Sequence, residues 1–166
     1  MSFEVWLAFV VTSAVLLAIP GPTVLLVVSY ALGAGRRSGL ATVPGVTLGD
    51  FTAMTISLLG AGAILAASAT LFTVLKLAGA AYLVWLGIQL WRAPVFDGAS
   101  GTAVVASPRR MFWNAWLVTS LNPKGIVFFI AFVPQFVNPA QPVLMQFAIL
   151  EASFVTMAML NAALWA

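Results

Sequence analysis

Cysteine and histidine are both absent from this chain of 166 residues. Their absence excludes disulfide bonds, thiol nucleophiles, zinc sites with Cys or His ligands, and catalytic triads built on histidine. Charge is scarce as well, because charged residues make up 7% of the chain, against about 25% in an ordinary soluble domain. We therefore expect no metal and no cofactor. The pI near 10.0 accompanies a net charge of only +3, so it does not indicate a nucleic-acid partner.

Apolar residues dominate what is present. They make up 63% of the chain, and the mean hydropathy is +1.10. In water such a surface would expose large apolar patches and aggregate, so lipid is the solvent that suits this protein. The composition predicts an all-α, polytopic membrane helix bundle that forms a single transmembrane domain over residues 1–166.

Five segments are long enough to cross a membrane, which takes about 20 mostly apolar residues. The expected spans are 5–31, 39–65, 71–91, 111–136 and 143–166. The longest polar stretch covers residues 93–110 and reads as a loop. It divides the chain into a first half, about 1–92, and a shorter second half, about 111–166.

The arginines suggest an orientation. All of them lie in two of the expected loops: Arg36, Arg37, Arg92, Arg109 and Arg110. The positive-inside rule places both loops in the cytoplasm and the N-terminus in the periplasm. The first residues, with Glu4, lack the positive start of a signal peptide, so we expect the first apolar segment to remain as a helix.

Three features share one depth in the membrane. Pro22, Asp50 and Lys124 each lie 13 or 14 residues from the nearest of these arginines. At about 1.5 Å per helical residue, each is roughly 20 Å from a headgroup-level charge. The hydrocarbon core is about 30 Å thick, so all three are expected near its midplane.

Pro20-Gly21-Pro22 is expected to break the first span. Proline lacks an N–H and clashes with the carbonyl four residues before it. The groups freed by such a break need partners or a water-lined cavity. A substrate pathway is the favoured interpretation, and a simple packing kink is the alternative.

Asn122-Pro123-Lys124 is expected to break the fourth span in the same way. Lys124 would place an ammonium group near mid-membrane, which is costly. The alternative is a lysine that extends to the interface, but its depth makes that reach long.

Asp50 directly follows Gly45-x-x-x-Gly49, a spacing that lets another helix approach closely. Its carboxylate could pair with Lys124, take up a proton or bind a substrate ammonium group. A purely structural ion pair is the alternative.

Three further polar residues lie inside expected spans. Glu151 is a candidate for a second titrating group, and Lys76 either belongs to the pathway or extends to the outer interface. Asn161 is interpreted as a helix–helix hydrogen bond.

The two broken spans would run in opposite directions through the membrane. Paired broken helices of this kind are typical of inverted repeats, in which they mark a transporter's binding site. A three-plus-three repeat has six spans, whereas five are expected here, so the second repeat is expected to be incomplete.

The ordered motifs of the chain resemble those of the LysE/RhtB superfamily of amino-acid exporters. They are Pro20-Gly21-Pro22, Gly33-x-Gly35-Arg36-Arg37-x-Gly39, Gly45-x-x-x-Gly49-Asp50, the segment 75–87 (LKLAGAAYLVWLG), and Phe112-x-Asn114 followed by Asn122-Pro123-Lys124.

This resemblance implies a six-helix protein of the bacterial inner membrane that exports amino acids or their analogues. It also implies proton antiport and a possible homodimer, with functional weight on Pro22, Asp50, Asn122, Pro123 and Lys124. The chain departs from the family pattern in having five expected spans and a glutamate at position 151.

Two other functions compete with export. A non-transporting membrane scaffold, or an inactive fragment of an exporter, would leave the deep charges unexplained. A membrane enzyme would need paired aspartates, a Ser–His pair or a metal site. No phosphate-binding loop of the G-x-x-x-x-G-K-[ST] type occurs, so transport would run on an ion gradient or downhill.

Overall fold

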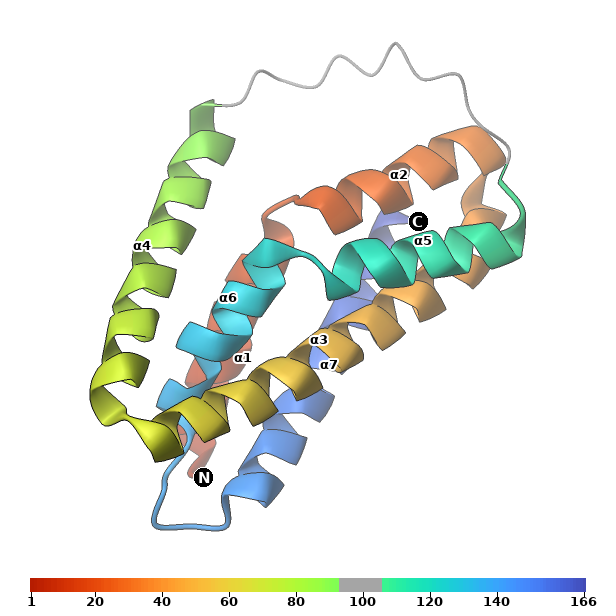
Figure 1. Cartoon of the computed structure of the whole chain (residues 1–166). Coiled ribbons are helices and arrows are strands. Elements are labelled where there is room, and N and C mark those ends of the chain that lie inside the picture. Colours follow the sequence, from red (N-terminus) through yellow and green to blue (C-terminus); the bar gives the residue numbers. More distant parts are fainter. Residues whose placement is uncertain (93–105) are drawn as a thin grey trace.

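The computed structural model describes residues 1–92 and 106–166, and every regular element in these ranges is a helix. The elements are α1 (Phe3–Ala18), α2 (Pro22–Ala34), η1 (Arg36–Ser38), α3 (Gly39–Ala67), α4 (Ala69–Arg92), α5 (Pro108–Ser120), α6 (Pro123–Ala131), η2 (Val133–Phe136) and α7 (Val143–Trp165) (Figure 1). The all-α class is confirmed. Most of the expected loop 93–110, including Asp97, lies outside the described residues, and the last residues of that loop already belong to α5.

Both expected breaks are present. The first expected span is two helices, α1 and α2, bent by 54°, and the fourth is α5 and α6, bent by 44°. In each case the second helix starts with a proline at its first position, Pro22 or Pro123. A proline there costs no hydrogen bond, because the first N–H groups of a helix have no partner within it.

The described helices account for two to four membrane spans by length and composition. In the described residues, Arg36–Ile64 and Val143–Trp165 are each long and apolar enough to cross a membrane. The α1–α2 pair and the α5–α6 pair also meet this test if each bent pair is counted as one span. The expected third span forms α4, whose apolar helical part is the shorter segment Thr73–Trp85. Five spans therefore stays a prediction.

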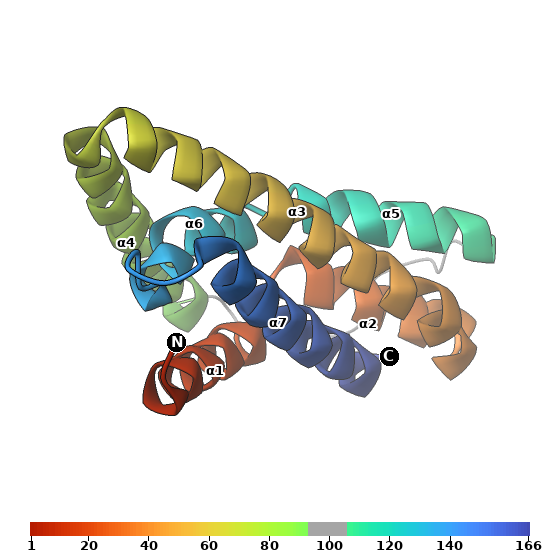
Figure 2. The same ribbon diagram turned by 90° about the horizontal axis from the view of Figure 1, so that it is seen from below.

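Helix α3 is the element around which the others pack. It lies along α5, α7 and α6, and it contacts α4 near its end. Helix α1 packs on α7, α2 packs on α5, and α4 covers α6 at one edge of the molecule (Figures 1 and 2). Residues far apart in the sequence are thereby brought together at the centre.

The buried apolar residues form two separate clusters. The large cluster, toward the N-terminal end of α1, comprises Phe9, Ala53, Met54, Leu58, Phe128, Phe129, Val133, Leu150, Phe154 and Ala158. The small cluster, toward the arginine-bearing end, comprises Val27, Val46, Ala115 and Ala162. The two helix breaks fall between these clusters.

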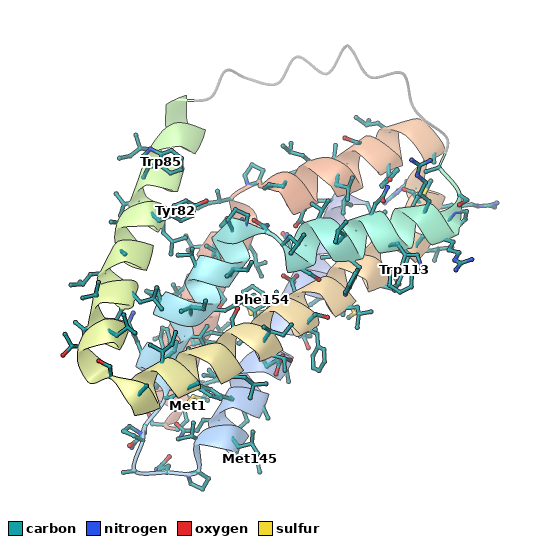
Figure 3. The ribbon with its side chains drawn as sticks, in the orientation of Figure 1. Met1, Tyr82, Trp85, Trp113, Met145 and Phe154 are labelled. Atoms are coloured by element: carbon teal, nitrogen blue, oxygen red, sulfur yellow. The ribbon has the colours of Figure 1, made fainter. Side chains whose placement is uncertain are left out.

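The outside of the molecule is also apolar, as a lipid environment requires. Large aliphatic side chains project from most helices, among them Leu40, which is 82% exposed, and Leu164, which is 86% exposed (Figure 3). Several hydroxyl groups inside the helices are satisfied locally: those of Thr12, Ser29 and Thr47 each donate to the carbonyl four residues earlier. Such bonds leave few polar groups facing lipid.

Gly45 and Gly49 form a close contact between α3 and α5. A Cβ atom on Gly45 would lie 2.9 Å from the Cβ of Ala115, and one on Gly49 would lie 2.7 Å from the Cβ of Thr119. The sequence-based interpretation of this glycine pair as a close-approach motif is confirmed. The contact also sets the position of Asp50, the next residue of α3.

We predict that Gly49→Ala destabilises the protein by about 1–3 kcal/mol, the usual cost of overpacking a tight contact. Thermal unfolding in detergent measures this loss. Gly60→Ala is the matched control in the same helix, because no atom lies within 4 Å of the added methyl group. An equal loss of stability in both variants would show that helix–helix crowding is not the cause.

Candidate functional site

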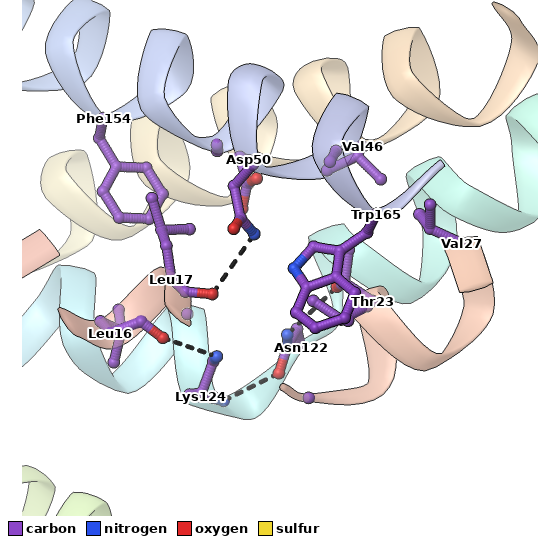
Figure 4. A pocket seen from close by; sticks show the side chains of 16 residues that line it. Leu16, Leu17, Thr23, Val27, Val46, Asp50, Asn122, Lys124, Phe154 and Trp165 are labelled. Carbon is purple, nitrogen blue, oxygen red and sulfur yellow. Dashed lines mark hydrogen bonds between the residues drawn. The ribbon is translucent and has the colours of Figure 1, made fainter. Parts of the chain in front are cut away.

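A cavity of about 40 Å³ lies where the two helix breaks meet, between the large and small clusters (Figure 4). It is lined by residues of α1, α2, α3, α6 and α7 and of the breaks before α2 and α6. They are Leu16, Leu17, Gly21, Thr23, Val24, Val27, Val46, Asp50, Asn122, Lys124, Gly125, Phe154, Ala158, Asn161, Ala162 and Trp165.

The carbonyl end of α1 is held by side chains from two other helices. Pro20 has no N–H, so the carbonyl of Leu16, four residues earlier, loses its helical donor. The Nζ atom of Lys124 replaces it, donating to the Leu16 carbonyl at 3.1 Å and to the Ile19 carbonyl at 2.7 Å. The amide of Asn161 donates to the Leu17 carbonyl at 3.3 Å. The freed carbonyls therefore draw α6 and α7 onto α1.

The start of α6 is fixed by Asn122, which is buried. Its side-chain oxygen accepts a hydrogen bond from the backbone N–H of Lys124 at 3.1 Å, as an N-cap residue does. Its amide group donates to the Thr23 hydroxyl at 3.3 Å, and that hydroxyl pairs with Thr119 at 3.2 Å. One short chain of hydrogen bonds thus joins α6, α2 and α5.

Asp50 and Lys124 line the same cavity, as their matched depth predicted. The hypothesised salt bridge between them is not formed, because the ammonium group is turned to the α1 carbonyls instead. Within the described ranges no side chain or backbone group donates a hydrogen bond to the Asp50 carboxylate. Lys124 is the sole cation and Asp50 the sole anion among the lining residues.

The cavity is too small for an amino acid. Ligand pockets typically measure about 300–1,000 Å³, whereas about 40 Å³ has room for little more than one water molecule. The large cluster lies on one side of this space and the small cluster on the other. A ligand the size of an amino acid could therefore fit between them only if helices moved apart.

The remaining predicted site residues occupy different places. Gly21 lines the cavity, and a Cβ atom there would lie 3.5 Å from the Lys124 Nζ. Pro20, Pro22 and Pro123 are exposed and act through the backbone breaks that they cause. Gly45 and Gly49 act through the α3–α5 contact described above.

Glu151 and Lys76 lie outside the cavity. Glu151 accepts a hydrogen bond from the Thr55 hydroxyl at 2.5 Å, which links α7 to α3. Lys76 is partly buried on α4, at the edge of the bundle. The structure does not bring either residue to the meeting point of the breaks.

Sequence reasoning missed several residues that line the cavity, chiefly Thr23, Phe154 and Trp165. Asn161 was expected to form a helix–helix hydrogen bond, which is confirmed, but not to line the cavity. A signal for α7 was present, since its buried residues recur at four-residue intervals: Gln146, Leu150, Phe154, Ala158 and Ala162. Because α7 is apolar on all sides, hydropathy alone does not distinguish these buried residues from the exposed ones.

Comparison with known proteins identifies the family. The family model described as LysE type translocator matches residues 14–166, a range that includes both breaks and the cavity. The chain belongs to this family. The resemblance noted from the motifs is confirmed, and so is the expectation that the protein is not an enzyme, because the family consists of transporters.

The curated relatives include two that are named as efflux proteins and one that is named as a membrane protein. The chain is 37% identical to a homoserine/homoserine lactone efflux protein of Salmonella typhimurium, over 96% of this chain and 77% of the relative. It is 38% identical to an uncharacterized membrane protein of Vibrio cholerae, over 94% of this chain and 76% of the relative. It is 32% identical to a leucine efflux protein of Enterobacter, over 78% of this chain and 62% of the relative. No solved structure matches.

We predict that Asn122→Ala lowers stability by about 1–2 kcal/mol, because it removes an N-cap and the donor to Thr23. Asn122→Ser, which keeps an N-cap acceptor, should recover part of the loss. Thermal unfolding of the purified variants measures both changes. If Ala and Ser behave like the wild type, the cap does not hold the start of α6.

Proposed function

We propose that this LysE-family protein exports amino acids or related small molecules across the bacterial inner membrane. The observation that carries the proposal is the small cavity at the meeting point of two broken spans, with one carboxylate, Asp50, on its wall. The relatives named for efflux of homoserine, homoserine lactone and leucine support the same class of substrate.

The polar groups around the cavity suit a zwitterion. The N-termini of α2 and α6 both start there, at Gly21 and Asn122. A helix N-terminus carries a partial positive charge, which favours a substrate carboxylate. Asp50 supplies the negative charge, which favours a proton or an ammonium group. Glu151 and Lys76 do not line the cavity, and their part in the pathway stays a prediction.

Alternating access would use the two clusters as seals. Opening of the small cluster, Val27, Val46, Ala115 and Ala162, would admit substrate from the arginine-bearing end. Opening of the large cluster would release it on the other side. Movement of the two bent spans against each other, as in inverted-repeat transporters, would open one seal at a time.

The proposed orientation follows the positive-inside rule. Arg37 lines a surface hollow together with Pro108, so the η1 turn and the start of α5, with Arg109 and Arg110, lie at one end of the molecule. The N-terminal amine is hydrogen-bonded to Gln141, which places it beside the α6–α7 connection. We place the arginine-bearing end in the cytoplasm and the N-terminus in the periplasm.

We predict that Asp50→Asn abolishes export and leaves the amount of protein in the membrane unchanged, because the amide keeps the size of the carboxylate and loses its charge. Bacteria that lack their own exporters would express the chain and be loaded with dipeptides, and amino acids released into the medium would be profiled. Glu4→Gln is the matched control, because Glu4 is an exposed carboxylate in the first turn of α1.

The outcomes separate the candidate functions. Excess release of a few amino acids that disappears in Asp50→Asn would support the exporter and name its substrates. Full release by Asp50→Asn would remove that carboxylate from the mechanism. No release of any amino acid or homoserine lactone, with the protein present in the membrane, would favour the non-transporting scaffold.

We also propose that export is coupled to proton entry, with Asp50 as the group that carries the proton. A protonophore should then slow wild-type export by about ten-fold or more, since the driving gradient is lost. Export measured in inverted vesicles with an imposed pH gradient checks this. Unchanged export after the gradient collapses would show that substrate runs downhill or uses another ion.

A further inference from the structure

The end of α1 is a cluster of backbone carbonyls that points toward other helices rather than along its own. Leu16, Leu17 and Ile19 each offer a carbonyl oxygen to a side chain of α6 or α7. Carbonyl oxygens at the C-terminal end of a helix carry partial negative charge, so they attract cations. We call these three carbonyls the carbonyl cradle.

The cradle already holds an ammonium group, that of Lys124. Its Nζ atom is 2.7 Å from the Ile19 carbonyl and 3.1 Å from the Leu16 carbonyl, and the lysine side chain lies against Gly21. These are the contacts that a primary ammonium ion makes with backbone carbonyls. The lysine therefore shows which chemical group fits the cradle.

A second position for the Lys124 ammonium exists in the same cavity. Asp50 lines the cavity with it, and within the described residues no group donates a hydrogen bond to the Asp50 carboxylate. A lysine has a long side chain with several rotatable bonds, so it can exchange partners by changing rotamer. The ammonium group can thus leave the carbonyls and still lie beside a negative group, the Asp50 carboxylate.

We propose that the carbonyl cradle binds the ammonium group of the substrate, and that Lys124 occupies it only while the cavity is empty, turning to Asp50 when substrate enters. This inference rests on the proposed function, because it concerns a substrate with a primary ammonium group in this cavity. Lys124 is then an internal competitor, and Asp50 is the position that receives it.

This arrangement also couples binding to movement of the helices. With Lys124 in the cradle, α6 is fastened to the end of α1 by two hydrogen bonds. When Lys124 turns to Asp50, α6 is joined to α3 instead, and the substrate takes over the α1 carbonyls. Occupancy by substrate would thereby release one broken span from the other.

The test is a double-mutant cycle on the purified full chain in detergent, with methylammonium as the probe and calorimetric titration as the measurement. Lys124→Met vacates the cradle, and we expect methylammonium to bind about ten-fold more tightly or better, because the apparent Kd equals the intrinsic Kd divided by the fraction of molecules in which the site is open. Lys76→Met, which removes a lysine outside the cavity, should leave the Kd unchanged.

Asp50→Asn distinguishes the cradle from direct binding to the carboxylate. In the Lys124 background it should weaken methylammonium binding several-fold, since the displaced lysine has no second partner. In the Lys124→Met background it should have little effect. Equal weakening in both backgrounds would place the probe on Asp50 and overturn the proposal.

Two further arms keep the result interpretable. Tetramethylammonium has the charge and no N–H donors, so it should gain nothing from Lys124→Met; an equal gain would show a general cation pocket and contradict the cradle. If Lys124→Met does not accumulate as folded protein, Lys124→Gln replaces it, and its weaker, neutral donors should give a smaller gain in the same direction.

The exporter and the cradle can fail separately. Export by the wild type without tighter binding in either Lys124 variant would overturn the cradle and leave the proposed function intact. The expected binding pattern in a protein that exports no amino acid would support the cradle and contradict the proposed function.

Discussion

The structure depends on how the chain satisfies the backbone carbonyls that lose their helical donors where the break at Pro20-Gly21-Pro22 ends α1. In water such carbonyls would bond to solvent, but in a bilayer each unsatisfied group costs roughly several kcal/mol. Lys124 of α6 and Asn161 of α7 meet this need, and so three helices converge on one point. The carbonyl end of α1 also compensates the charge of the buried Lys124 ammonium group.

The second constraint is the close contact between α3 and α5. Gly45 and Gly49 allow the backbones to approach, and Thr119 lies directly over Gly49 while its hydroxyl joins the Asn122–Thr23 chain of hydrogen bonds. The helix that carries Asp50 is therefore fixed against the same elements that carry the breaks. Small residues here serve the site indirectly, since they place the carboxylate rather than contact a ligand.

These two constraints leave a cavity that has polar groups at its centre and apolar clusters on both sides. A transporter needs this arrangement, because a pathway open at both ends would leak ions. The cavity is small, and the carbonyls at the end of α1 are already occupied by the ammonium group of Lys124. Export of a zwitterion, as proposed, would require the helices to separate and new partners to replace the internal ones.

The sequence by itself determined the helical class and the two breaks, because proline chemistry and residue spacing along a helix are local properties. From the same spacing it predicted a shared level for Asp50 and Lys124, which line one cavity. It also indicated the close approach at Gly45 and Gly49.

Only the tertiary structure decided which groups pair. Depth placed Lys124 level with Asp50, but the carbonyls of Leu16 and Ile19, invisible as such in a sequence, take its ammonium group. Glu151, the candidate for a second titrating group, lies outside the cavity, because the direction in which a side chain points depends on how its helix is rotated against its neighbours.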